Sequence, residues 1–358
     1  VLSSHEAAPI LVEALKRLEY RGYDSAGIAT VNDGTLDRRR AVGKLVNLSD
    51  LLVHDPLRGK AGIGHTRWAT HGAPSVANAH PHKAGPVAVV HNGIIENFRE
   101  LREELAQHGI SFSTETDTET VALLTQHFMA EGANAVEAAN MALDKLEGAF
   151  ALAFLFEGQD DLIVVARRGS PLAIGHGDGE MFVGSDAIAL SPLTNQITYL
   201  AEGDRAVITR SRVEITDSKG QHVERPIKSI EVDATKIDKA GHKHFMAKEI
   251  AEQPTVIAQA LGHYISTSGE ISLPGTGMDF SAIDRLTMVA CGTAYYACLT
   301  AKYWFEQIAR IPVEVDVASE FRYREPPIPA KTTALFVSQS GEAADTLAAL
   351  RYCAGKAD

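Results

Sequence analysis

Residues 149–156 read Ala149-Phe150-Ala151-Leu152-Ala153-Phe154-Leu155-Phe156, a run that contains only apolar side chains. A short apolar run of this length, followed by turn-forming residues, is typical of a buried strand. Four further segments with strand character follow it, at 162–166, 197–200, 205–208 and 213–216. Several consecutive strands next to helical segments predict stacked sheets that are flanked by helices.

On the amino-terminal side of this run, helices are mixed with shorter strands. The helical segments, which show apolar residues at helical spacing and suitable end residues, are 7–20, 96–108, 117–131 and 135–146. The strand segments are 26–31, 36–42 and 87–90. Asn32-Asp33-Gly34 is typical of a hairpin turn between the first two strands, and the third strand leads into Asn92-Gly93.

The carboxyl-terminal third follows a different pattern. After a helical segment at 245–264, strands at 286–290, 313–317 and 333–337 each lead through a loop into a helix or a helical turn. Strands that alternate with helices predict a parallel, doubly wound sheet. Because three strands are few for such a sheet, we expect this domain to be cut short at its carboxyl end.

The length of 358 residues exceeds that of one typical domain, so two domains are expected. The polar character of the residues after 216 indicates a linker between them. We therefore expect a first domain at 1–220, a linker at 221–243 and a second domain at 244–358.

The composition excludes several classes of protein. The net charge of −12 argues against a general binder of nucleic acids or anionic membranes, because both need a basic face. No apolar run reaches transmembrane length, and residues 1–15 lack the plan of a signal peptide. Three cysteines, Cys291, Cys298 and Cys353, are too few for a disulfide framework and indicate a reducing compartment, so cytoplasm is expected.

The segment 64–72, Gly-His-Thr-Arg-Trp-Ala-Thr-His-Gly, opens a group of residues that could hold a free amino acid and its reacting amide. Arg67 offers a planar fork for a carboxylate, and Asp117 at a helix start could pair with an ammonium group. The Asn92 side chain and the Gly93 backbone N–H are suited to an oxyanion hole. From the residues alone, Arg67 could instead be a structural ion-pair partner on a loop, Asn92-Gly93 a turn, and Asp117 a helix N-cap.

Two further groups of residues are candidate sites. The histidines at 65, 71, 80, 82 and 91 match no standard zinc spacing, so no metal is expected. In the last third, Ser338-Gln339-Ser340-Gly341-Glu342 and Cys291-Gly292-Thr293 each stand between a strand and a helix. Hydroxyls and backbone N–H groups at a helix start can bind an anion, although a simple helix cap is the alternative.

Four strings resemble a known family: LEYRGYDSAG at 18–27, HTRWATHG at 65–72, NAHPH at 78–82 and HNGIIEN at 91–97. They resemble the glutamine–fructose-6-phosphate aminotransferases (isomerizing), and the likeness covers essentially the whole chain. The resemblance implies an α+β domain followed by an α/β domain. The first is the four-layer α-β-β-α sandwich of N-terminal-nucleophile amidotransferases, and the second a sugar isomerase (SIS) domain with a flavodoxin-like three-layer α-β-α architecture.

The resemblance also implies roles for residues of the first domain. The glutamine-binding residues would be Arg67, Thr70, His71, Gly93 and Asp117. Asn92 and Gly93 would form the oxyanion hole, Arg21 would support the region of the nucleophile, and Trp68 would gate an ammonia channel. The family's nucleophile is an N-terminal cysteine whose own α-amine is the base. No cysteine precedes Cys291, so we expect the chain as printed to lack glutaminase activity.

In the SIS domain the resemblance implies that fructose 6-phosphate is bound by Gly292, Thr293, Ser338, Gln339 and Ser340. Ala294 and Ala343 stand where the family often has hydroxyl residues, and each would lose a bond worth about 1.5–3 kcal/mol to a charged phosphate. We therefore expect weakened phosphate affinity. Cys291 follows a buried strand and is expected to pack rather than react. The resemblance places the family's isomerising residues in a second SIS domain outside the printed sequence, so we expect the printed chain to lack aldose–ketose conversion.

The implied reaction transfers the amide nitrogen of L-glutamine to fructose 6-phosphate, without a metal or organic cofactor, in a parent protein expected to be a homodimer. A non-catalytic sugar-phosphate-binding or regulatory module is the alternative. Amidotransferases of purine or asparagine synthesis would carry a different second domain, and the segment 338–342 argues against them.

Overall fold

A computed structural model describes residues 1–19, 23–68, 72–230, 242–265, 269–271, 273, 279–339, 341 and 343–356. The chain divides into two compact units, Val1–Ile237 and Asp238–Asp358. In the part of the chain described, none of the helices combines the length and apolar composition needed to cross a bilayer.

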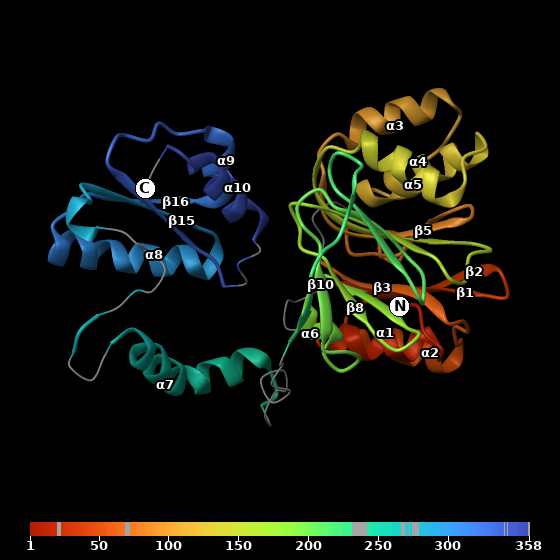
Figure 1. Ribbon diagram of the computed structural model, residues 1–358, viewed down its shortest axis with the longest axis horizontal. Coiled ribbons are helices and arrows are strands. Elements are labelled where there is room, and N and C mark those ends of the chain that lie inside the picture. Colours follow the sequence, from red (N-terminus) through yellow and green to blue (C-terminus); the bar gives the residue numbers. More distant parts are fainter. Residues whose placement is uncertain are drawn as a thin grey trace. The chain divides into compact units, whose positions relative to one another are not determined.

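The first unit contains two stacked sheets between two helical layers (Figure 1). One sheet has the order β13-β12-β11-β7-β6-β5-β4, and its neighbours pair antiparallel. Its strands are β4 (His82–Ala84), β5 (Val87–Ile95), β6 (Gly148–Phe156), β7 (Ile163–Arg168), β11 (Arg205–Ile208), β12 (Val213–Thr216) and β13 (His222–Val223). The helices on its outer face are α3 (Phe98–Gln107), α4 (Asp117–Ala130) and α5 (Ala135–Lys145).

The second sheet of this unit consists of two parts, with the orders β2-β1-β3 and β14-β10-β8-β9. Leu2 joins them, because it forms antiparallel bridges to Ala61 of β3 and Met181 of β9. The strands are β1 (Ser25–Asn32), β2 (Thr35–Val42), β3 (Ala61–Arg67), β8 (Ala173–His176), β9 (Met181–Gly184), β10 (Gln196–Tyr199) and β14 (Ile227–Ser229). The helices of the adjoining layer are α1 (Ala7–Lys16), α2 (Leu45–His54) and α6 (Ala187–Leu190).

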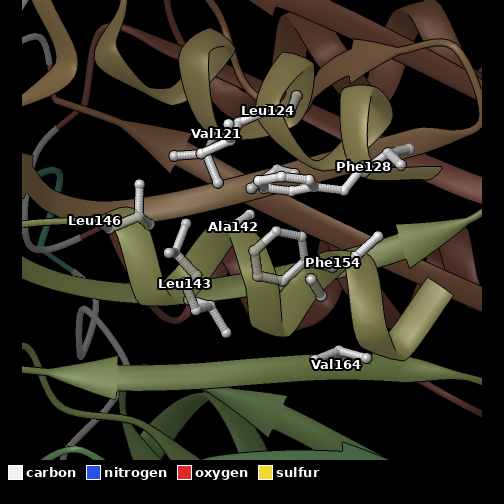
Figure 2. Packing of buried hydrophobic residues seen from close by; sticks show 14 of the residues in the cluster. Val121, Leu124, Phe128, Ala142, Leu143, Leu146, Phe154 and Val164 are labelled. Carbon is white, nitrogen blue, oxygen red and sulfur yellow. The ribbon is translucent and has the colours of Figure 1, made fainter. Parts of the chain in front are cut away.

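Strand β6 is buried on both faces, which explains its uninterrupted apolar sequence. Leu152, Phe154 and Phe156 pack against α4 and α5. Phe128 of α4 and Leu143 of α5 lie close to Phe154 (Figure 2). Leu155 and the alternate residues belong instead to the cluster between the two sheets, which also contains Ile63 of β3. Burying each large side chain contributes about 1.5–3 kcal/mol, so this strand anchors two of the three apolar layers.

The second unit contains a three-stranded parallel sheet with the order β16-β15-β17. Its elements are α7 (Phe245–Tyr264), the 3-10 turn Phe280–Ala282, β15 (Arg285–Ala290), α8 (Gly292–Trp304), the π-helical turn Phe305–Ala309, β16 (Val313–Val317), α9 (Ala318–Arg324), β17 (Thr332–Val337) and α10 (Ala344–Cys353). Cys298 of α8 packs in a cluster with Met288, whereas Phe321 and Ala349 of α9 and α10 pack in another with Val289. Adjacent residues of β15 point to opposite faces, so helices cover both faces of this sheet, as predicted for a doubly wound domain.

Several elements differ from the sequence-based expectations. The prediction missed α2, α6, β3, β4, β8, β9, β13 and β14. Strand β5 continues through Asn92-Gly93 to Ile95, so these residues do not form a turn. Strands β13 and β14 lie within the expected linker 221–243, and they pair with β12 and β10 of the first unit. The rest of that expected linker, up to residue 241, lies largely outside the described residues.

Candidate functional sites

The first candidate site lies where β3, β5 and the start of α4 meet. His65 on β3 faces Asn92 on β5, and His65 Nε2 lies 2.7 Å from Asn92 Oδ1. Asp117, the first residue of α4, accepts a hydrogen bond at Oδ2 from the backbone N–H of Ile95 on β5, at 2.9 Å. The two contacts connect three elements that are far apart in the sequence.

The backbone of Gly93 requires glycine. Its φ is +123°, and a Cβ atom there would lie 2.0 Å from the carbonyl oxygen of Ala149 on the neighbouring strand β6. Only glycine adopts this conformation at low cost, and its missing side chain allows the two strands to approach. Asn92 and Gly93 are therefore held within a paired strand, which positions their donor groups more rigidly than a turn would.

Arg67 is the last residue of β3 rather than a loop residue, and its side chain is 4% exposed. Its Nη2 donates to the Gly72 carbonyl oxygen at 3.0 Å, and its Nη1 lies 3.7 Å from Asp24 Oδ1. The ion-pair interpretation and the carboxylate-binding one are thus compatible, because the planar guanidinium carries several donors. These contacts place the Arg67 side chain beside Gly72 and Asp24.

Two polar residues hold Ala73 beside the segment that precedes α4. Asn78 donates through Nδ2 to the Ala73 carbonyl oxygen at 3.0 Å and to Glu115 Oε2 at 3.1 Å. Glu115 returns its backbone N–H to Asn78 Oδ1 at 3.2 Å, and it lies two residues before Asp117. Sequence reasoning missed Asn78 as a residue that shapes the site, because its partner Glu115 is 37 residues away in the chain.

Asp117 is 4% exposed and is not the N-cap, a position that Thr116 occupies. Its Oδ1 lies 3.4 Å from Thr118 Oγ1, and its Oδ2 lies 3.7 Å from His91 Nδ1. A carboxylate in the first turn is stabilised by the partial positive charge of the helix start. The geometry places a buried carboxyl group against β5 at Ile95.

Histidines surround this region, and burial keeps them neutral. The rings of His65 and His80 stack with centroids 4.3 Å apart, and His80 and His82 meet edge to face at 5.0 Å. Burial lowers the pKa of His65 to about 4 and the pKa of His82 to about 3, and it brings the pKa of His80 well below its usual value. Among the described residues, no group of three or more histidine, cysteine, aspartate and glutamate side chains is arranged to hold a metal ion.

The remaining residues expected in this site are placed only in part. Trp68 follows β3 and is 68% exposed. Arg21, Thr70 and His71 lie outside the described residues.

The second candidate site lies at one edge of the parallel sheet. Ala290 at the end of β15 pairs with Val337 at the end of β17, so the loops that follow these strands meet at the same edge. Gly292 and Gly341 have φ values of +59° and +70°, which suit glycine. Ser338 accepts a hydrogen bond at Oγ from the Gly341 N–H at 3.1 Å.

The helix starts at this edge carry no side-chain caps. Cys291 precedes α8 and Ala343 precedes α10, and neither side chain accepts a capping hydrogen bond. Cys291 instead packs beside the apolar cluster of α9 and α10. The backbone N–H groups of two helix starts, with Thr293 and Gln339 nearby in the chain, make this edge suited to an anion. Ser340 and Glu342 lie outside the described residues.

Comparison with known proteins assigns a different domain model to each of the two units. A glutamine amidotransferase domain model matches residues 66–192, and a SIS domain model matches residues 279–357. The glutamine–fructose-6-phosphate aminotransferase [isomerizing] of Brucella suis is 59% identical over 99% of this chain, and that of Zymomonas mobilis is 55% identical over 98%. The chain resembles these aminotransferases over nearly its whole length. It spans 58% of the length of each of them.

Solved structures show the fold. A glutamine phosphoribosylpyrophosphate amidotransferase from B. subtilis superimposes with a TM-score of 0.54 and 20% identity, over 87% of this chain and 64% of that one. The predicted fold class is confirmed: an N-terminal-nucleophile amidotransferase sandwich precedes a SIS domain.

Proposed function

We propose that this chain is the glutamine-binding part and the first sugar-phosphate-binding part of an enzyme that aminates fructose 6-phosphate. The products are glucosamine 6-phosphate and glutamate. The names of its curated relatives and the two matched domain models support this assignment. The boundaries 1–220 and 244–358 remain our proposal for the two domains, with β13 and β14 attached to the first one.

The observation that carries the glutaminase assignment is the way in which Val1 and Leu2 pair with strand β3. Leu2 pairs with Ala61, and Val1 and Gly62 exchange hydrogen bonds at 2.7 and 2.9 Å. Residues before Val1 that continued this antiparallel pairing would run along β3 toward Arg67. About five such residues would bring their first member level with Arg67. An N-terminal nucleophile delivered there would stand beside Asn92.

The residues of the first unit then have complementary roles. Arg67 binds the α-carboxylate of glutamine and Asp117 its α-ammonium group, with Thr70 and His71 completing the pocket. A thiolate attacks the amide carbon, and the N–H groups of Asn92 Nδ2 and the Gly93 backbone receive the developing oxyanion. One such donor accelerates acyl transfer by about 10²–10³-fold. Arg21 supports the nucleophile, and Trp68 gates the path of the released ammonia.

A polypeptide of the printed sequence alone is proposed to be inactive as a glutaminase. Its cysteines are Cys291, Cys298 and Cys353, which all belong to the second unit. The mechanism requires a thiol and a free α-amine on one residue, so an internal side chain does not replace it.

The second unit is proposed to bind fructose 6-phosphate. Gly292, Thr293, Ser338, Gln339 and Ser340 would surround the phosphate at the edge where β15 and β17 end. Ala294 and Ala343 supply no hydroxyl there, so the affinity is weakened. The reaction needs no metal or organic cofactor, and the enzyme is proposed to act as a cytoplasmic homodimer without nucleic-acid or membrane partners.

Titration of the chain with L-glutamine tests the first site, with D-glutamine as the control ligand. We expect saturable binding of L-glutamine that Asp117→Asn and Arg67→Lys each weaken by at least tenfold, since each loses a charge or a bidentate contact. Equal binding of both enantiomers, or wild-type affinity in both variants, would refute the assignment.

A non-catalytic sugar-phosphate-binding module is the alternative. Adding an N-terminal cysteine at the position given by the β3 register distinguishes the two. Glutamine hydrolysis by the extended chain supports the enzyme, whereas fructose 6-phosphate binding without hydrolysis supports the module.

A further inference from the structure

We propose that His65 is a positioning residue, which holds the Asn92 side-chain amide in the orientation that turns its N–H donors toward the substrate. The inference rests on the proposed glutaminase function. It concerns a residue that contacts Asn92, the proposed oxyanion donor.

The position of His65 follows from the strand. His65 and Arg67 are two residues apart on β3, so their side chains lie on the same face of the sheet. That face meets β5, where His65 Nε2 lies 2.7 Å from Asn92 Oδ1. His65 therefore lies behind the proposed oxyanion hole, next to the residue that would bind the substrate carboxylate.

The direction of this hydrogen bond determines the protonation of the ring. A side-chain carbonyl oxygen only accepts, so in the arrangement with Asn92 Oδ1 facing the ring it is His65 Nε2 that carries the proton. Burial lowers the pKa of His65 to about 4, which leaves one proton on the ring at neutral pH.

The proton on His65 determines the orientation of the Asn92 side-chain amide. This amide is planar, with Oδ1 and Nδ2 on opposite sides of Cγ, and the two ends have nearly the same shape. Without a donor facing Oδ1, a half-turn of the amide would exchange oxygen for nitrogen. An oxygen directed at a developing oxyanion would repel it, whereas the Nδ2 group stabilises it. The His65 proton selects the second arrangement.

A second histidine fixes the ring of His65 in turn. His80 stacks on it with an angle of 20° between the rings. His80 Nδ1 accepts the backbone N–H of His91 at 3.3 Å, so the His80 proton lies at Nε2, where it faces Thr118 Oγ1 at 3.3 Å. Because the backbone N–H of His91 fixes the tautomer of His80, the His80 ring has a defined orientation. The neutral ring of His65 stacks on it.

Two substitutions separate positioning from packing. His65→Gln keeps a side-chain N–H that can reach Asn92 Oδ1, whereas His65→Leu fills similar space without a donor. His176→Gln on β8 is the matched control, because its imidazole contacts Thr198 of β10 at 2.8 Å and β8 does not pair with β5.

The kinetic test uses the full-length protein with an N-terminal cysteine. We expect His65→Leu to lower kcat for glutamine hydrolysis by about 10- to 100-fold with KM within about twofold of wild type, because ground-state binding is unchanged. His65→Gln should recover most of kcat, and His176→Gln should match wild type. Equal losses in both His65 variants, or a change confined to KM, would overturn the proposal.

Nitrogen-15 NMR of histidine-labelled chain gives a readout that does not depend on folding of a variant. We expect the wild-type His65 signal to report a proton at Nε2, and a proton at Nδ1 would overturn the proposal even if His65→Leu fails to fold. If the full-length wild-type protein hydrolyses no glutamine, the proposed function fails, whereas hydrolysis with wild-type kcat in His65→Leu refutes the positioning role alone.

Discussion

The buried neutral histidines predict that the first unit loses stability between pH 8 and pH 5. An imidazole in the unfolded chain has a pKa of about 6.5. Burial lowers the pKa to about 4 in His65 and to about 3 in His82, and it moves the pKa of His80 in the same direction. At acidic pH the unfolded chain therefore binds more protons than the folded one. The free energy that these histidines contribute to folding is complete above the pKa of the unfolded imidazole, and it decreases as the pH falls below that value.

The size of the effect follows from these values. At pH 5 the unfolded imidazole is almost fully protonated, whereas His65 and His82 remain mostly neutral in the folded unit. Linkage gives a loss of about 2 kcal/mol for each of the two between pH 8 and pH 5. His80 adds a loss of the same sign. Because a typical domain is stable by only about 5–15 kcal/mol, such a loss is large.

The assay is urea-dependent hydrogen exchange at pH 8 and pH 5, read on peptides from β5 and β6 so that only the first unit is followed. His82→Gln removes one titrating group and keeps a donor near Thr116, whose Oγ1 lies 3.0 Å from His82 Nε2. We expect its loss of stability between the two pH values to be about 2 kcal/mol smaller than that of wild type. His222→Gln, at an exposed position, is the control for removing an imidazole. The same loss in His82→Gln and wild type would refute the reasoning.

Three further predictions concern single positions. Gly93→Ala should destabilise the first unit by at least about 2 kcal/mol in urea unfolding, because its Cβ would meet the Ala149 carbonyl oxygen; a change below about 0.5 kcal/mol would contradict this. Ala343→Thr should tighten fructose 6-phosphate binding by about tenfold or more in calorimetry, and unchanged affinity would count against the proposed phosphate site. Asn134→Ala should cost about 1 kcal/mol, since Asn134 and Glu137 form a reciprocal capping box at the start of α5; wild-type stability in urea would show that the box contributes nothing.

The regular elements with strong patterns were predictable. The apolar run 149–156 indicated a buried strand, and it is the strand whose two faces pack against different layers. The strand–loop–helix units after residue 285 indicated a parallel sheet, which the structure has. Both predictions succeed because side-chain periodicity is a local property that burial imposes along one element.

Elements with weak patterns were missed, and the site depends on one of them. Strand β3 contains two glycines, a histidine and an arginine within seven residues, so its sequence has no clear alternation. It is a strand because β1 pairs along one edge and Leu2 pairs with it at the other. Without β3 as a strand, His65 and Arg67 could not be placed on one face, and the contact of His65 with Asn92 could not be anticipated.

The sequence by itself determined the residue types that chemistry requires, the helices and strands with a clear apolar period, and the order of two different domains. Only the tertiary structure decided that Asn92-Gly93 lies inside a strand, that Asp117 accepts the Ile95 N–H, and that His65 faces Asn92. The physical reason is that strand pairing and register arise from contacts between segments that are distant in the chain. Burial then set the protonation of the histidines, which no sequence pattern reveals.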